Sequence, residues 1–403
     1  MDDFTSRADM DKSAKYFFTI VMVLLCVGLV MVYSTTAVKS NRSGAGDTGM
    51  LFSQLLKIAI ALAGMILMMK IDYRILARHH TKILILFAFL LVLVLMPIPG
   101  FCCTLNGASR WFRVGAFMVQ PSEFAKLGLV IVIASMVVRS GEKIQSFFHG
   151  FLPPVAATAL ICLLILVEPD FGTCALLGSL AVLLLVVGGA RIVHFAVIVS
   201  VCAPLLFFFA FNNMEHVRIR FVSFFEQGGS DQVTRGITAL GSGGVLGSGL
   251  GAGMSKLYYV PLCESDFIFS IIGEELGFLG ATGVVVLFAL LIYHGMKVLL
   301  GIKNRFGFIL ALGILLLIST QALANIAVVL GAAPAKGIAL PFISSGGSSM
   351  MALMMGVGIF MRIARYPDLP VPRFEAEPMP ALVRNSVERL KDVLTWGGNN
   401  DRS

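Results

Sequence analysis

The sequence predicts an all-α integral membrane protein, and two observations support this. Of the 403 residues, 57% are apolar and 13% are charged, and the mean hydropathy is +0.89. A soluble chain of this length would have too little polar surface to cover its core. The apolar residues also form continuous runs without the period-two alternation of a membrane barrel, so helices must satisfy the backbone in the bilayer.

Ten apolar runs are long enough to cross the hydrocarbon core, which takes about 20 helical residues. Their approximate bounds are 16–33, 52–69, 83–98, 123–138, 150–167, 173–190, 193–210, 267–296, 306–330 and 345–363. The sequence therefore predicts a ten-helix membrane domain at 16–363, between a cytoplasmic segment at 1–15 and a cytoplasmic tail at 364–403. The first run lacks a small-residue cleavage site, which indicates an uncleaved span.

The basic residues set the orientation, because short loops rich in Lys and Arg stay in the cytoplasm. With the N-terminus inside, cytoplasmic segments hold most of the 31 Lys and Arg residues, including Lys70, Arg74, Arg78 and Lys82. Residues 211–266 then form a large extracytoplasmic loop between helices 7 and 8. We expect both termini to lie in the cytoplasm. Topology explains the net charge of +8, so no nucleic-acid partner is expected.

The seven cysteines divide by position. Four lie within predicted spans, where they are most simply packing residues: Cys26, Cys162, Cys174 and Cys202. The other three, Cys102, Cys103 and Cys263, lie in predicted outer loops, where an oxidising environment permits pairing. Free or packed thiols and a disulfide between the 97–122 loop and Cys263 are both open.

Asp266 stands at the threshold of an apolar run, in the sequence DFIFSIIGEELG. An ionised acid left in hydrocarbon costs several kcal/mol, so such an acid is retained where it meets water, a partner charge or a substrate. Asp266 is therefore the first functional candidate. Glu274 and Glu275 lie farther along the same run, and we expect at least one of them to meet a basic residue.

Two further polar groups have both a functional and a structural interpretation. Glu123 and Lys126 are spaced i,i+3 at the start of the fourth run, so they share a helix face and could form an ion pair. Asp170 follows Glu168 and Pro169 at a tight outer turn, where it could cap the next helix toward Thr173.

The outer loop carries seven glycines between Gly241 and Gly253. Glycine permits tight turns and close approach of the backbone to a ligand. The spacing of a nucleotide-binding P-loop is absent from this stretch. We expect a flexible lining of a substrate cleft, with a merely permissive loop as the alternative.

Seven collinear motifs resemble the SEDS family of bacterial shape, elongation, division and sporulation proteins. They are QPSEFAKLG (120–128), EPDFGT (168–173), ALGSGGVLGSGLGAG (239–253), KLYY-P (256–261), DFIFSIIGEELGFLG (266–280), QALANI (321–326) and KGIALPFISSGGSS (336–349). The KLYY element resembles the division-type branch of the family. The resemblance covers residues 106–349 and agrees with ten helices.

The resemblance implies a peptidoglycan glycosyltransferase of cell division that polymerises lipid II into glycan strands and releases undecaprenyl pyrophosphate. The family's essential acid falls on Asp266, which would be the catalytic residue. Substrate-binding roles fall by similarity on Glu123, Lys126, Asp170 and Lys336.

The chemistry of such a transfer agrees with these residue types. A carboxylate that accepts the proton of a sugar hydroxyl gives about 10² to 10⁴ in rate. Cationic groups stabilise the pyrophosphate as its charge grows. Candidate cations on the outer side are Arg110, Arg218, Arg220, Lys256 and Lys336. A divalent cation, Mg²⁺ or Mn²⁺, could share the role, although no metal-ligand spacing in the sequence demands one.

One departure from the family pattern lies beside the predicted catalytic residue. The family has P-E-x-H-T before its acid, whereas this chain reads Pro261, Leu262, Cys263, Glu264 and Ser265. Glu264 thus replaces a histidine two residues from Asp266. Two nearby carboxylates raise one apparent pKa, which would either poise a base nearer neutral pH or reflect altered substrate contacts.

Two other classes of function compete with the polymerase. Buried charges and broken helices also occur in transporters, so a lipid II flippase is one alternative, and a non-catalytic division scaffold is another. No acyl-transfer nucleophile motif appears in an outer segment, so crosslinking needs another protein. The resemblance implies a class B penicillin-binding protein as partner, with other division proteins beside it.

Overall fold

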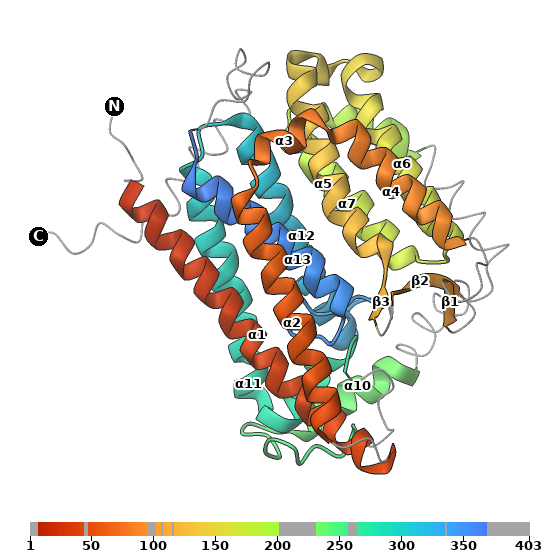
Figure 1. Ribbon diagram of the computed structural model, residues 1–403, viewed down its shortest axis with the longest axis vertical. Helices are drawn as coiled ribbons and strands as arrows, with labels where there is room; N and C mark the ends of the chain where they lie inside the picture. Colours follow the sequence, from red (N-terminus) through yellow and green to blue (C-terminus); the bar gives the residue numbers. More distant parts are fainter. Residues whose placement is uncertain are drawn as a thin grey trace, which may run out of the picture.

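A computed structural model shows a bundle of long helices (Figure 1). It describes residues 7–43, 47–95, 102–105, 108–114, 117–200, 231–256, 264–334 and 337–368. The long helices are α1 (Arg7–Ser43), α2 (Asp47–Lys70), α4 (His80–Leu95), α5 (Pro121–Ser140), α6 (Leu152–Val167), α7 (Phe171–Val187), α11 (Ile268–Leu300), α12 (Arg305–Val329) and α13 (Gly347–Arg365). The predicted helical membrane fold is confirmed.

The described residues contain seven helical stretches that are long and apolar enough to cross a membrane. Two shorter apolar helices, α4 and α7, coincide with two more of the predicted runs. The predicted run at 193–210 lies mostly outside the described residues, so the count of ten spans stays a prediction. The tail beyond residue 368 also lies outside them.

Polar residues at the helix starts explain several boundaries. Asn304 caps α12, because its Oδ1 accepts hydrogen bonds from the backbone N–H groups of Phe306 (2.8 Å) and Gly307 (3.3 Å). Pro121 occupies the first position of α5, where its missing N–H costs nothing. The shorter elements with bounds in the described part of the chain are α3 (Tyr73–Arg78), the 3₁₀ turn η1 (Gly141–Gln145), the π turn η2 (Phe147–Phe151) and α10 (Asp231–Ser242).

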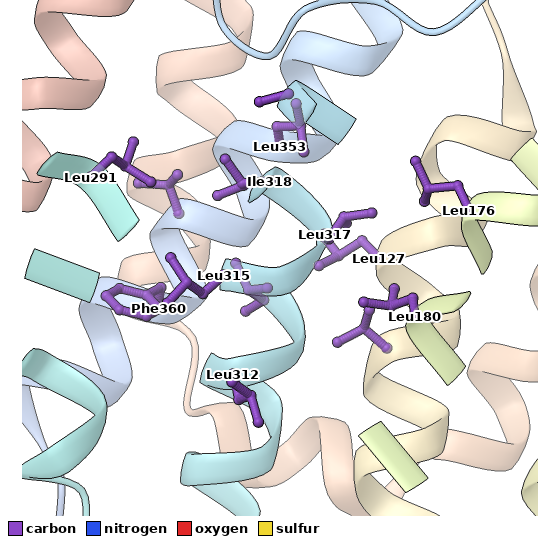
Figure 2. Packing of buried hydrophobic residues seen from close by; sticks show 14 of the residues in the cluster. Leu127, Leu176, Leu180, Leu291, Leu312, Leu315, Leu317, Ile318, Leu353 and Phe360 are labelled. Atoms are coloured by element: carbon purple, nitrogen blue, oxygen red, sulfur yellow. The ribbon is translucent and has the colours of Figure 1, made fainter. Parts of the chain in front are cut away.

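Helix α12 lies at the centre of the bundle and is buried along most of its length. Figure 2 shows its leucines interdigitating with side chains of α5, α7 and α13, among them Leu127, Leu180 and Phe360. Outward-facing side chains of the outer helices are instead apolar and exposed, as for Phe52, Phe89 and Leu163. Lipid tails solvate such a surface.

Contacts at the helix ends separate two faces of the bundle. On one face, the Tyr73 hydroxyl donates to the Tyr366 carbonyl at 3.3 Å, and Met10 packs against Gly301. The start of α1, helix α3 and the end of α13 therefore lie together, and Asp266 precedes α11 at the opposite end. We call that opposite end the Asp266 face. This placement agrees with the predicted topology, while which face is cytoplasmic stays a prediction.

A small antiparallel sheet lies within the predicted outer loop 97–122, and the sequence analysis did not predict it. Its strands are β1 (Cys102–Leu105), β2 (Ala108–Val114) and β3 (Phe117–Val119), in the order β1-β2-β3. Leu105 pairs with Ala108 across a two-residue Asn-Gly connection, a strong hairpin signal that could have revealed the sheet. The sheet leads directly into α5.

Candidate active site

Asp266 lies in the turn that precedes α11, on the Asp266 face, and is half-buried. Its backbone carbonyl accepts a hydrogen bond of 2.8 Å from Nδ2 of Asn325, on α12. Its side chain lies against the backbone of Gly337, because a Cβ added there would stand only 3.3 Å from Asp266 Oδ2. The acid is thus held between α12 and the segment that leads to α13.

That segment, residues 337–346, is bonded to the turn of Asp266 at two more points. Ser344 Oγ donates to the Ser265 carbonyl at 2.6 Å and accepts from the Leu340 N–H at 2.8 Å. The Ser345 N–H donates to the Glu264 carbonyl at 3.0 Å. These bonds fix the backbone just before the acid, and the Asn325 bond fixes the carbonyl of Asp266 itself, so the position of the acid does not depend on its side chain alone.

Glu123 and Lys126 form the ion pair that their spacing predicted, with 2.7 Å between Lys126 Nζ and Glu123 Oε1. Both side chains are largely buried near the start of α5. The Gln120 N–H donates to Ser348 Oγ at 3.0 Å, which joins this helix start to the start of α13. The pair therefore lies on the same face as Asp266, and its contact with substrate stays a prediction.

Asp170 caps α7, as the structural interpretation predicted. Its two carboxylate oxygens accept from the Thr173 N–H at 3.0 Å and the Thr173 hydroxyl at 2.9 Å. Arg110, on β2, donates to the carbonyls of Glu168 and Pro169, the latter at 2.8 Å. Arg110 was expected to face phosphate, and in the structure its guanidinium holds the small sheet to this turn.

Glu168 is a buried acid in the same turn, with 1% of the residue exposed. Burial, together with the neighbouring charge of Asp170, raises the pKa of Glu168 from its ordinary 4.5 to about 8, while Arg110 acts in the opposite direction. Glu168 is therefore protonated at neutral pH, and this turn carries less negative charge than its sequence suggests.

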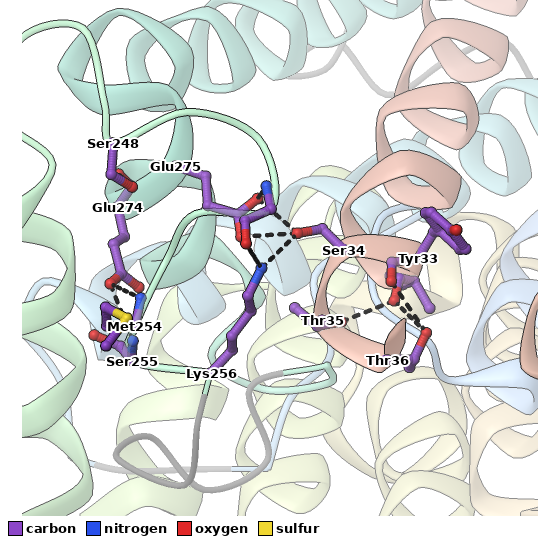
Figure 3. Close-up of polar contacts among 12 residues, drawn as sticks. Tyr33, Ser34, Thr35, Thr36, Ser248, Met254, Ser255, Lys256, Glu274 and Glu275 are labelled. Carbon is purple, nitrogen blue, oxygen red and sulfur yellow. Dashed lines mark hydrogen bonds and ion pairs between the residues drawn. The ribbon is translucent and has the colours of Figure 1, made fainter. Parts of the chain in front are cut away.

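Lys256 was expected to contact the substrate, and the structure places it in the interior instead (Figure 3). Its ammonium donates to Glu275 Oε1 (2.7 Å), to the Gly251 carbonyl (2.7 Å) and to Ser34 Oγ (3.1 Å) on α1. All three protons are used, so Lys256 stabilises the protein rather than facing a ligand. The expectation that an acid of this run meets a basic residue is confirmed.

The glycine-rich segment 243–256 is tied to α11 and is not the flexible lining that we expected. Glu274 Oε1 accepts from the N–H groups of Met254 (2.8 Å) and Ser255 (3.0 Å), and the Phe278 N–H donates to the Gly244 carbonyl at 2.9 Å. A Cβ added to Gly243 would lie 2.0 Å from the Gly273 carbonyl oxygen. Gly243, Gly247 and Gly253 thus permit close approach to α11, whereas Gly244, Gly249 and Gly251 have positive φ and no α11 atom within 4 Å of an added Cβ.

Three predicted cations and one cysteine of the possible disulfide lie outside the part of the chain that the structure describes. Arg218, Arg220, Lys336 and Cys263 lie outside the described residues, so their roles stay predictions. Within the part of the chain that the structure describes, no three His, Cys, Asp or Glu side chains gather where they could hold a metal ion. The divalent cation likewise stays a prediction.

Two residues of this region were missed by the sequence analysis. Lys57, on α2, packs its side chain against Gly347 at the start of α13, since a Cβ there would lie 3.3 Å from Lys57 Cδ. A lysine inside an apolar run is the signal that could have identified it. Asn325 gave no such signal, because its partners are distant in the sequence.

Comparisons with known proteins agree with this fold. Residues 14–368 match the profile of the cell cycle proteins FtsW, RodA and SpoVE. Stage V sporulation protein E of Bacillus subtilis (strain 168) is 35% identical over 353 residues, which cover 86% of this chain and 95% of that protein. A probable peptidoglycan glycosyltransferase FtsW of Geobacter sulfurreducens (strain ATCC 51573 / DSM 12127 / PCA) is 36% identical over 348 residues, covering 85% and 92%.

Solved structures share the fold at lower identity. A chain from work on the structural coordination of polymerization and crosslinking by a peptidoglycan synthase complex superposes with a TM-score of 0.73, at 24% identity over 88% of this chain and 98% of that one. The rod shape-determining protein RodA of Thermus thermophilus gives a TM-score of 0.63, at 23% identity over 88% and 97%.

The fold and the site define a class: a multi-pass helical membrane protein that holds an acid where several helix ends meet on one face. Within this class, the chain belongs to the FtsW/RodA/SpoVE family, that is, the SEDS family.

Proposed function

We propose that this protein is a peptidoglycan glycosyltransferase that polymerises lipid II into glycan strands during cell division. The observation that carries the proposal is the placement of Asp266, whose carbonyl is bonded to Asn325 and whose side chain lies against Gly337. The relatives named as probable peptidoglycan glycosyltransferases support it at 36% identity over 348 residues.

In the proposed reaction, Asp266 is the general base. Its carboxylate accepts the proton of the 4-hydroxyl of GlcNAc as that oxygen attacks the anomeric carbon of MurNAc on a second lipid-linked chain. The new C–O bond forms from the opposite side as the bond to the pyrophosphate oxygen breaks, so the α linkage becomes β. Undecaprenyl pyrophosphate leaves with the bonding electrons.

Cations stabilise that leaving group in proportion to the charge it gains. We assign this role to Lys336, Arg218 and Arg220, with a divalent cation as a further candidate, and we add Lys57 because it packs beside the start of α13. The Glu123–Lys126 pair presents a fixed, nearly neutral polar group on the same face, suited to hydroxyl and amide groups of the substrate. Asp170 acts in this scheme by positioning the start of α7.

A class B penicillin-binding protein is the proposed partner, since glycosyl transfer alone leaves strands uncrosslinked. We place the protein in the inner membrane at the division site, with both termini in the cytoplasm. We propose that polymerisation at the full rate also depends on this partner. Equal rates from the purified chain alone and from the complex would contradict that dependence.

The test is polymerisation of fluorescent lipid II by the purified protein with its class B partner, under a block of transpeptidation. We expect glycan ladders from the wild type and from Asp368→Ala, an exposed acid of the opposite face, and none from a folded Asp266→Ala variant. Glycan ladders from the Asp266→Ala variant would show that Asp266 is not the general base. Ladders from no variant, with lipid II crossing liposome membranes, would favour the flippase; neither activity would favour the scaffold.

A further inference from the structure

Asn325 is a buried amide on α12 that the reaction scheme above does not use. It is 2% exposed, and its Nδ2 group donates two hydrogen bonds, to the Asp266 carbonyl at 2.8 Å and to the Ile338 carbonyl at 2.7 Å. An amide NH₂ has two protons, so both are committed. One side chain thus connects the turn that bears the proposed base with the segment that leads to α13.

The two carbonyl acceptors lie on two segments that meet beside the Asp266 carboxylate: the turn before α11 and residues 337–346. Asp266 lies in the turn before α11, and Ile338 follows Gly337, whose backbone lies against the Asp266 carboxylate. Fixing both carbonyls from one amide therefore sets the distance between the carboxylate and the Gly337 backbone. Lys336, a proposed cation for the leaving group, immediately precedes Gly337 in the sequence.

We propose that Asn325 is a positioning residue for glycosyl transfer, which orients Asp266 by holding its carbonyl and that of Ile338 in one clamp. This inference rests on the proposed function. Ser344 makes a parallel link, because its hydroxyl donates to the Ser265 carbonyl at 2.6 Å. We call the bonds of Asn325 and Ser344 the Asn325 clamp.

The clamp acts on turnover more than on binding. A misplacement of about 1 Å between reacting groups can cost about 100-fold in rate. The clamp bonds only backbone groups of the protein, so its loss removes no substrate contact. Loss of the clamp should therefore lower kcat and leave KM and lipid II binding nearly unchanged.

The test uses full-length protein with its class B partner. Asn325→Ala removes both hydrogen bonds. Asn325→Asp keeps the size of the side chain but replaces the donating NH₂ group by an oxygen, which cannot donate to the two carbonyls. We expect kcat to fall by about 10- to 100-fold in both, with KM and fluorescent lipid II binding within about twofold. The matched control is Ser319→Ala, a buried residue of α12 whose hydroxyl donates within its own helix, and it should keep wild-type kcat.

Ser344→Ala keeps the inference testable if the Asn325 variants do not fold, and we expect a smaller fall in kcat, of about 3- to 10-fold. Wild-type kcat in a folded Asn325→Ala or in Ser344→Ala would overturn the clamp. A fall matched by lost lipid II binding would overturn it as well. An active Asp266→Ala would instead refute the proposed base, so the two failures are distinguishable.

Discussion

Lys256 Nζ lies 2.7 Å from Glu275 Oε1, and the two side chains are 2% and 0% exposed. Removing one member of a buried pair leaves an uncompensated charge, which costs about 3–5 kcal/mol. We expect Lys256→Met to lower the thermal stability of the purified protein strongly. If Lys256→Met instead kept the wild-type unfolding temperature and bound lipid II more weakly, Lys256 would be a substrate-binding residue.

The double variant Lys256→Met with Glu275→Leu is the matched control for that experiment. Replacing both charges by apolar side chains of similar size is often neutral. We therefore expect the double variant to recover much of the stability lost in Lys256→Met. Equal instability of the single and double variants would show that the pair's other bonds, to Ser34 and Gly251, dominate.

Glu168 predicts a pH dependence of stability with a definite sign. Its pKa is about 8 in the folded protein and 4.5 ordinarily, so between these values the folded state binds more protons than the unfolded state. Stability contributed by this group is therefore lost as pH rises, by about 1.4 kcal/mol per pH unit at most. Below about pH 4.5 both states are protonated and the effect vanishes.

The variant Glu168→Gln removes this titration and keeps the shape of the side chain. We expect it to match the wild type near pH 5 and to unfold at a higher temperature than the wild type at pH 8. Thermal unfolding in detergent at both pH values measures the difference. Parallel shifts of wild type and variant with pH would mean that Glu168 does not titrate in this range.

Gly243 and Gly241 allow a comparison of a closely packed glycine with an open one. A Cβ at Gly243 would lie 2.0 Å from a carbonyl oxygen of α11, whereas a Cβ at Gly241, on α10, meets no atom within 4 Å. We expect Gly243→Ala to cost more than about 2 kcal/mol in unfolding free energy and Gly241→Ala to stay within about 0.5 kcal/mol. Tolerance of both changes, measured by thermal unfolding, would contradict the tight docking of segment 243–256.

The charge of Lys57, a proposed cation for the leaving group on the Asp266 face, can be tested by substitution. Replacing it by Gln removes a cation beside the start of α13, and we expect about a tenfold weaker binding of lipid II. The control is Lys70→Gln, which removes the same charge at the far end of the same helix and should bind normally. Equal binding by both variants would exclude Lys57 from the leaving-group site.

Sequence patterns were enough to predict the helical membrane fold and several local contacts, because those depend on neighbours along the chain. The Glu123–Lys126 pair and the Asp170 cap are of this kind, each spanning three residues. The partner of Glu275 could be expected in type, since an acid in an apolar run needs a cation, but not in identity.

The contacts that the sequence did not predict join distant segments. Asn325 meets Asp266 across 59 residues, and Ser34 meets Glu275 across 241. No periodicity records such a contact, so Lys256 was expected among the substrate cations by its charge and outer position alone. The glycines of segment 243–256 were wrongly expected to line a substrate cleft for a related reason. Glycine permits close approach of the backbone to another group, but the sequence does not identify that group.

Helix α11 is broken at Gly277, which has φ 69° and ψ −169°. The segment before it in the chain spans that break, because Ser248 donates to the Glu274 carbonyl and the Leu279 N–H donates to the Val245 carbonyl. Unpaired backbone groups are costly in lipid. Since synthesis proceeds from the N-terminus, the groups that satisfy the break exist before the break itself. During biogenesis, the residues that pair with the backbone groups at the break are therefore already part of the chain when the break is synthesised.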